Sequence, residues 1–308
     1  MTELKRWIVV SDPKAGQSPV VNVKLVGAEL ADLLGLNDEQ RRDKVKERIL
    51  KGLSSTAPGP KPPLEGGIYS KILVKILQDL ASSKGMSLSK LIEELKKNND
   101  LYGELIERFS KTITTKIKER EILPLAFVNP KLIEKLNAEH YIITFRYWKD
   151  KKNREKVNIT ALVQPDETIS ENEARTLTDV MIDRIGETEV EVEAFRAKAW
   201  QIVLDEVVGS KLLGLKIGDE VDGSIIGLDY VKLRIAGGSD ATGIPMHPGV
   251  PGPVKKKVLL SGPPGFHPRE KGERRRKMVR GNVISDGTVK RDKMVQINVA
   301  IIYPEEKQ

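Results

Sequence analysis

Positive charge in this chain is concentrated in one glycine- and proline-rich segment near the carboxyl terminus. Residues 245–293 contain 13 Lys or Arg and 4 Asp or Glu, a local charge of +9, whereas the whole chain of 308 residues carries +8. Turn-forming runs such as Pro251-Gly252-Pro253 and Gly262-Pro263-Pro264-Gly265 interrupt the segment. Because it lacks the apolar side chains to pack itself down, it has to form long loops on a β scaffold. We expect a negatively charged partner.

The densest run of charge is Arg274 to Lys277. Four successive cations would encircle a helix, and in an extended chain they would alternate between two faces, so they cannot all meet a flat surface. Folded RNA offers phosphates on several sides, and arginine matches phosphate with two parallel hydrogen bonds. The glycines at 237 and 238 would let backbone amides approach phosphates closely. The candidate RNA-binding residues are Lys255, Lys256, Lys257, Arg269, Lys271, Arg274, Arg275, Arg276, Lys277, Arg280, Gly237 and Gly238.

Each of these features also has a plainer interpretation. The charge run could be a solvated surface or a localisation patch, and the two glycines could serve ordinary turns between strands. Asp219, Glu220 and Asp222 could hold a divalent ion, but a polar turn is the better interpretation of such a cluster. Trp148 and Trp200 could stack on bases, although aromatic residues in alternating strands more often pack against a core.

Hydrophobic periodicity changes along the chain and divides it into parts. Residues 6–10 and 20–26 read as strands. Between 37 and 137, apolar residues recur at spacings of three and four, which is typical of helices. Residues 139–195 read as a hairpin followed by a helix, and 199–308 as strands separated by turns. In the region before 195, Ser170 and Glu173 form a capping box, which predicts a helix from there to about 185, ended by glycine.

Composition excludes several classes of function. The chain has no cysteine, which rules out disulfides, thiol catalysis and cysteine-ligated metals and fits a reducing compartment. Its three histidines, His140, His247 and His267, are too scattered to suggest a metal site. No apolar run is long enough for a signal peptide or a membrane span, so we expect a cytoplasmic protein.

A series of motifs in the last hundred residues resembles the ribosomal protein S6e family of archaeal and eukaryotic small subunits. The similar stretches are residues 212–224, 237–246, 259–265, 272–282 and 295–298. Residues 8–14 resemble the family's first strand, and Trp200 to Leu204 resemble its second. Many ordered motifs over about residues 4–17 and 200–303 make this resemblance specific.

The resemblance implies an α+β protein whose small, mostly β, barrel-like domain combines residues 1–18 with 199–308. Residues 19–198 would then be an insertion after the first strand, and its balanced charge favours a surface position touching solvent, protein or only the edge of the RNA. The implied role is structural, in the cytoplasmic ribosome, with small-subunit rRNA and neighbouring ribosomal proteins as partners. It implies no catalysis, cofactor, metal, membrane or small-molecule substrate. The alternatives are a free RNA-binding translation regulator and an RNA-targeted enzyme with its site in the insert.

Overall fold

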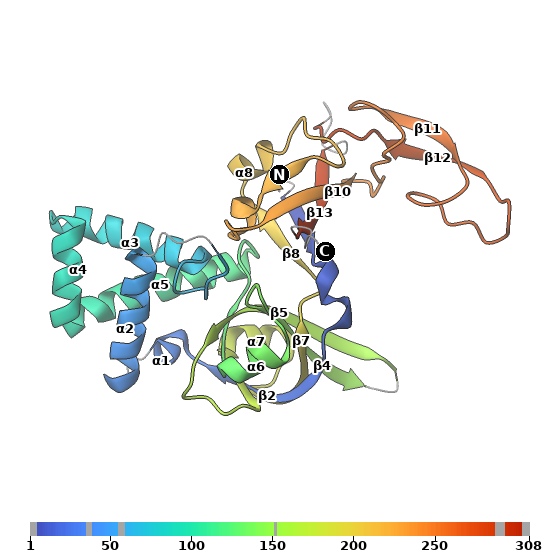
Figure 1. The fold of residues 1–308 in the computed structure, drawn as a ribbon. Coiled ribbons are helices and arrows are strands. Elements are labelled where there is room, and N and C mark those ends of the chain that lie inside the picture. The colour runs from blue at the N-terminus through green and yellow to red at the C-terminus, as the bar shows by residue number, and fades with distance from the viewer. Residues whose placement is uncertain (1–4, 35–38, 55–58, 151–152, 287–292, 304–308) are drawn as a thin grey trace, which may run out of the picture. The chain divides into compact units, whose positions relative to one another are not determined.

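The computed structural model describes residues 5–34, 39–54, 59–150, 153–286 and 293–303. The fold is mixed α+β, and the chain divides into two compact units (Figure 1). We call them the terminal unit, which joins Met1–Lys14 to Lys198–Gln308, and the inserted unit, Ala15–Ala197. Each unit is described by itself.

The terminal unit is built on a five-stranded sheet with the order β8-β1-β13-β10-β9. Strand β1 runs parallel to β13 and antiparallel to β8, and the remaining neighbours are antiparallel. The sheet strands are β1 (Arg6–Ser11), β8 (Ala199–Leu204), β9 (Glu220–Asp222), β10 (Lys232–Asp240) and β13 (Met294–Ile302). The connections contain helix α8 (Glu206–Ser210), the 3-10 helix η2 (Gly223–Ile226) and a two-stranded ribbon of β11 (Lys255–Leu260) and β12 (Arg275–Arg280).

Alternating side chains explain why these segments form strands. Ile8 and Val10 of β1 are fully buried, whereas the residues between and after them are only partly so. Leu233 and Ile235 of β10 alternate in the same way. A period of two places one face of each strand against the core, as in an antiparallel sheet with one solvated side.

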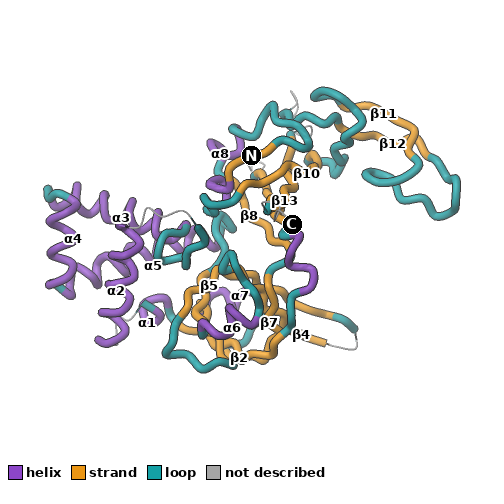
Figure 2. Tube along the Cα trace, viewed as in Figure 1, coloured by secondary structure: helices purple, strands orange, loops and turns teal. Residues whose placement is uncertain are grey.

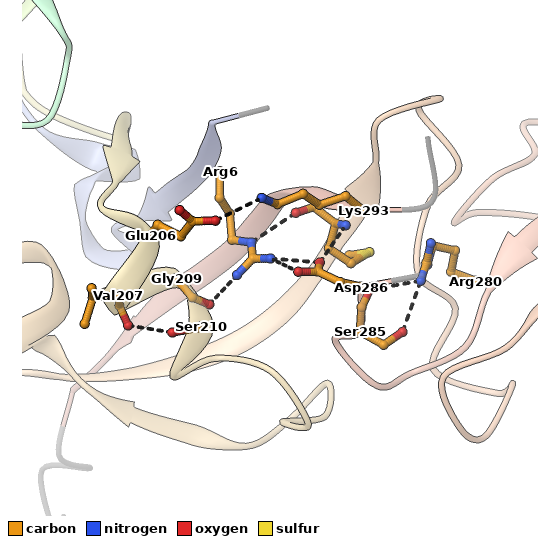
Figure 3. Close-up of polar contacts among 10 residues, drawn as sticks. Arg6, Glu206, Val207, Gly209, Ser210, Arg280, Ser285, Asp286 and Lys293 are labelled. Carbon is orange, nitrogen blue, oxygen red and sulfur yellow. Dashed lines mark hydrogen bonds and ion pairs between the residues drawn. The ribbon is translucent and has the colours of Figure 1, made fainter. Parts of the chain in front are cut away.

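A buried arginine at the start of β1 ties together three distant parts of the terminal unit (Figure 3). The Arg6 Nη2 atom lies 2.8 and 2.7 Å from the two carboxylate oxygens of Asp286. Its Nε donates to the carbonyl of Met294 at 3.1 Å, and its Nη1 donates to the carbonyl of Gly209 in α8. Because the charge is paired and its donors find acceptors, burial of this guanidinium is compensated.

The inserted unit leaves and re-enters the terminal unit at one point of one strand pair. Ser11 at the end of β1 is opposite Ala199 at the start of β8, and the amide of Asp12 donates to the carbonyl of Lys198 at 2.9 Å. The chain continues from β1 into the 3-10 helix η1 (Pro13–Gln17). The two ends of the insertion are therefore held as close together as the ends of an ordinary hairpin turn.

The inserted unit contains a closed barrel with the strand order β2-β6-β3-β5-β4-β7. Its strands are β2 (Val21–Ala28), β3 (Leu125–Val128), β4 (Ile142–Asp150), β5 (Glu155–Pro165), β6 (Glu173–Leu177) and β7 (Glu189–Arg196). Helices α6 (Pro130–Lys135) and α7 (Thr178–Arg184) contribute Leu132 and Met181 to the apolar cluster of the barrel strands (Figure 1). The barrel is thus a packed core.

A layer of helices covers one side of the barrel. It consists of α1 (Leu30–Leu33), α2 (Glu39–Ser54), α3 (Ile68–Lys84), α4 (Leu88–Lys97) and α5 (Asn99–Lys118). Strand β3 is buried on both faces: Ala126 and Val128 belong to the barrel cluster, whereas Leu125 and Phe127 belong to the cluster of the helices. Barrel and helices therefore share a strand between two cores.

The structure corrects three expectations. The closed barrel is in the inserted unit, whereas the terminal sheet of the described residues ends at β9, which has only three residues and is too short to close a barrel. The helix predicted from Ser170 begins only at Thr178, because β6 pairs with β2 and β3 on its two sides. Strand β3 lies in the region predicted as mainly helical and was not foreseen there, since four consecutive buried residues show no alternation.

We expect the terminal unit to fold without the insertion when the strand register is preserved. In this variant, residues 13–197 are deleted and Asp12 is joined to Lys198 through Asn-Gly, the sequence that a two-residue hairpin turn prefers. Circular dichroism and thermal unfolding should show a cooperative β protein.

The matched control also removes Lys198, which shifts the register by one residue. Buried and exposed residues of β8 would exchange faces, so this control should be strongly destabilised. The prediction would be contradicted if the variant that keeps Lys198 were unfolded. It would also be contradicted if the variants with and without Lys198 were equally stable.

Candidate nucleic-acid interface

Arg275, Arg276 and Lys277 of the charge run lie on strand β12 of the ribbon, and Arg274 is the last residue of the loop before it. The strands pair antiparallel from Lys255 opposite Arg280 to Leu260 opposite Arg275, and residues 261–274 form the loop at the far end (Figure 2). Because the run is extended, successive cations point to opposite faces of the ribbon.

The register defines two different faces of the ribbon. One face carries Lys255, Lys257, Leu259, Arg276, Met278 and Arg280, and the other carries Lys256, Val258, Leu260, Arg275, Lys277 and Val279. The second face packs its apolar residues into a small cluster with Val250 and Phe266. The loops therefore have a small core of their own, which the sequence analysis did not foresee.

Most of the candidate cations are exposed. They are Lys255, Lys256, Lys257, Arg269, Lys271, Arg274, Arg275, Arg276 and Lys277. One acid lies among them: Glu273 accepts a hydrogen bond from the amide of Arg269 at 2.7 Å and pairs with the Arg275 side chain at 2.9 Å. The hydrogen bond from that amide and the nearby guanidinium hold the pKa of Glu273 below its usual value. This carboxylate orders the loop and stays charged.

Arg280 differs from the other candidates because it is buried, with 4% of its side chain exposed. It donates to the carbonyl and the hydroxyl of Ser285, both at 3.1 Å, and lies 3.7 Å from the carboxylate of Asp240 (Figure 3 shows the contact with Ser285). On the opposite strand, Lys255 pairs with the same carboxylate at 3.1 Å. These two cations attach the base of the ribbon to β10, so we remove Arg280 from the set of surface contacts.

Asp240, whose side chain is fully buried, is the centre of this attachment. One carboxylate oxygen accepts from the amide and hydroxyl of Thr242, at 3.0 and 2.7 Å, and from the amide of Ile244 at 2.9 Å. Burial alone would raise the pKa of Asp240, but the bonds from Thr242 and Ile244, together with the ammonium of Lys255, outweigh burial and lower it. The carboxylate is therefore charged at neutral pH.

The glycine pair is explained by the sheet. The β10–β13 register shifts between Ile235 and Gly237, and Gly237 has a φ of +156°, which side chains rarely adopt. A Cβ at Gly238 would lie 2.4 Å from the carbonyl oxygen of Gln296. Both glycines thus serve a bulge and a close strand contact, and we do not assign them to phosphate binding.

The remaining candidates separate in the same way. Asp219 accepts from the amide of Lys216 at 2.8 Å, and Glu220 pairs with Arg234 at 3.5 Å, which explains this acidic turn without an ion. Trp200 is buried in β8, whereas Trp148 is partly exposed. None of the described helices is long and apolar enough to cross a membrane.

Sequence reasoning missed Asp240 as the partner of two candidate cations. The signal available was local: an aspartate followed two residues later by threonine and then by glycine is typical of a turn that the carboxylate closes. That pattern predicts the turn, but it does not show which distant cations the second oxygen pairs with.

Comparisons of the sequence with a family model and with known proteins point to the same family. The sequence model described as Ribosomal protein S6e matches residues 190–308. The small ribosomal subunit protein eS6 of Hyperthermus butylicus is 50% identical over 190 residues, which are 62% of this chain and 83% of that protein. The protein of the same name from Staphylothermus marinus is 51% identical over 187 residues, which are 61% of this chain and 83% of that protein. The one from Aeropyrum pernix is 46% identical over 197 residues, which are 63% of this chain and 83% of that protein. These stretches are longer than residues 190–308, so the similarity extends into the inserted unit.

We expect Asp240→Asn to destabilise the terminal unit by about 1–3 kcal/mol, the cost of removing one partner of buried polar groups. Because the pKa of Asp240 is lowered on folding, its contribution is complete above the unfolded pKa of about 4 and is lost as the pH falls below that value. The difference from the unchanged protein should therefore be larger at pH 7 than at pH 3. Urea unfolding at both pH values measures it.

The control is Asp183→Asn, which changes a carboxylate that is 81% exposed. It should shift the midpoint of urea unfolding little at either pH. A loss of stability for Asp240→Asn that is as large at pH 3 as at pH 7 would show that the charge of Asp240 does not hold the ribbon.

Proposed function

Because the chain belongs to the ribosomal protein S6e family, we propose that it binds rRNA through the exposed cations of the β11–β12 ribbon. The relatives compared are small ribosomal subunit proteins, and the chain covers 83% of the first of them at 50% identity. It is accordingly a structural protein of the small subunit in the cytoplasmic ribosome, where rRNA and other proteins surround it, and it is not an enzyme.

The observation that carries the rRNA contact is the alternation of exposed cations on both faces of a narrow ribbon. Lys257 and Arg276 point to one side, and Lys256, Arg275 and Lys277 point to the other. A two-stranded ribbon is only about 5 Å wide between strand axes, so phosphates of two RNA segments can approach it from opposite sides. Both sets of cations are then neutralised, which a single flat surface does not achieve.

The contact set is narrower than the sequence alone suggests. We assign phosphate contacts to the exposed cations of the ribbon and its loop: Lys256, Lys257, Arg269, Lys271, Arg274, Arg275, Arg276 and Lys277. Lys255 and Arg280 hold the ribbon on β10 through Asp240. Such contacts supply affinity and position the protein, whereas base sequence is not read by them.

We also propose that the inserted unit folds on its own and lies largely at the surface of the subunit. Ion pairs of its own charges support this: Glu104 of α5 lies 2.8 Å from the ammonium of Lys84 and 2.9 Å from the guanidinium of Arg108. A helix layer of this kind presents a mixed, solvated face, unlike a surface buried in phosphates.

The salt dependence of RNA affinity tests the ribbon. With about six to eight phosphate contacts, log affinity should fall with log salt at a slope of about −4 to −7. Arg274→Ala, Arg275→Ala and Arg276→Ala together should flatten that slope by about two units. Filter binding to small-subunit rRNA of Hyperthermus butylicus over a range of salt concentrations measures both.

The matched control replaces three exposed lysines of the helix layer, Lys75, Lys90 and Lys111, with alanine. It removes the same charge from the protein and should leave the slope unchanged. Equal slopes for the arginine variant and the unchanged protein would show that the ribbon is merely solvated. Loss of the protein from subunits in a high-salt wash would favour the free regulator.

A further inference from the structure

The inserted unit has a projecting ribbon of its own at the hairpin of β4 and β5. Strand β4 pairs with β7 only from Ile143 to Arg146, whereas its pairing with β5 continues to Asp150 opposite Glu155. Beyond Arg146 the hairpin therefore leaves the barrel, and Figure 1 shows it extending outward. The sequence from 146 to 156 contains six cations and two acids, an unusual excess in a unit of balanced charge.

One face of this hairpin carries an aromatic ring between two cations. Trp148 is directly opposite Lys156, whose ammonium lies 5.8 Å from the centre of the indole ring. Arg146 is two residues earlier on the same face, with its guanidinium carbon 5.7 Å from the ring. Trp148 is partly exposed, so the ring is not buried by packing against the barrel.

Arg146 is the fixed member of this arrangement. Its guanidinium lies 4.5 Å from the ring centre of Phe195 on β7, and its Nη1 lies 3.6 Å from the carboxylate of Glu193. An arginine stacked on one ring and paired with a carboxylate has few accessible orientations. It therefore holds one edge of the Trp148 site against the barrel strand β7.

Three cations near the outer end of the hairpin are not paired with a carboxylate in the described part of the chain. Lys149, Arg154 and Lys156 are exposed, and among the described residues no carboxylate lies within ion-pair distance of them. Asp150 is engaged in the turn, where its carboxylate accepts a hydrogen bond from the side-chain amide of Asn153 at 2.7 Å. In the helix layer, by contrast, Lys84 and Arg108 are both paired with Glu104.

We propose that the part of the β4–β5 hairpin that extends beyond Arg146 is a second RNA-binding surface, formed by Trp148, Lys149, Arg154 and Lys156, which binds an unpaired stretch of RNA. A base stacks on Trp148, and Lys149, Arg154 and Lys156 contact the phosphates on its two sides. A partly exposed indole with cations along the same ribbon is a combination suited to single-stranded nucleic acid, since stacking suits any base and the cations follow the backbone. The proposal extends the proposed function to the inserted unit and rests on it only for RNA as the partner.

The test uses the full chain and a uridine oligomer of about 12 nucleotides. Lys149→Gln, Arg154→Gln and Lys156→Gln together should weaken binding at least tenfold. Trp148→Ala should weaken it about fivefold or more, the loss expected when stacking on one base is removed. Trp148→Phe should keep most of the affinity but lose most of the tryptophan fluorescence quenching that RNA causes. Circular dichroism shows whether each variant is folded.

The control for lost charge is the set Lys75→Gln, Lys90→Gln and Lys111→Gln, which should bind like the unchanged protein. Each variant is also combined with the alanine changes at Arg274, Arg275 and Arg276. A further loss in the combined variant supports a separate site.

Two results would overturn the proposal. The first is that the hairpin variants bind RNA with normal affinity while the variant changed at Arg274, Arg275 and Arg276 binds it weakly. That outcome leaves the proposed function of the β11–β12 ribbon intact. The second is equal competition by polyglutamate of the same charge, which would show a general acidic-partner surface. A weak hairpin variant beside a normal arginine variant would instead contradict the proposed function and support the hairpin.

Discussion

The position of β1 inside the terminal sheet constrains everything else in this molecule. The strand pairs with β8 on one side and with β13 on the other, so residues 6–11 need partners from 199–204 and from 296–300. Pairings this distant cost chain entropy before they contribute stability. They also fix the two ends of the insertion opposite each other, and the insertion meets that requirement because Val21 of β2 pairs with Ala194 of β7.

Within the basic segment, position relative to one carboxylate decides what a cation does. Lys255 and Arg280 at the base of the ribbon both approach Asp240, so their charge is used within the protein. Arg276 and Lys257, farther along the same face, have no such partner in the strand ladder and remain exposed. A local excess of charge therefore contains both structural and binding residues, and only the three-dimensional neighbours separate them.

Features that depend on neighbouring residues could be predicted from the sequence, and features that depend on distant pairing could not. The hairpin of β4 and β5 and the helices between 37 and 137 follow from local periodicity, and the structure has this hairpin and helices α2 to α5 in that region. The helix predicted at Ser170 fails because β6 finds partners on two sides, a fact that its own sequence does not record. Likewise, Trp148 and Trp200 are equivalent as sequence, but only the former lies where its strand leaves a barrel.

The burial of strand β3 on both faces constrains how the insertion can vary among relatives. Leu125 and Phe127 face the helices, while Ala126 and Val128 face the barrel interior, so the strand has no solvated side. A relative that has the barrel without the helices would expose the first pair to water. Its sequence at those two positions should therefore be polar, alternating with apolar residues, unless another segment covers them. Whether the residues at positions 125 and 127 of a homologue are apolar or polar therefore indicates whether helices cover its barrel.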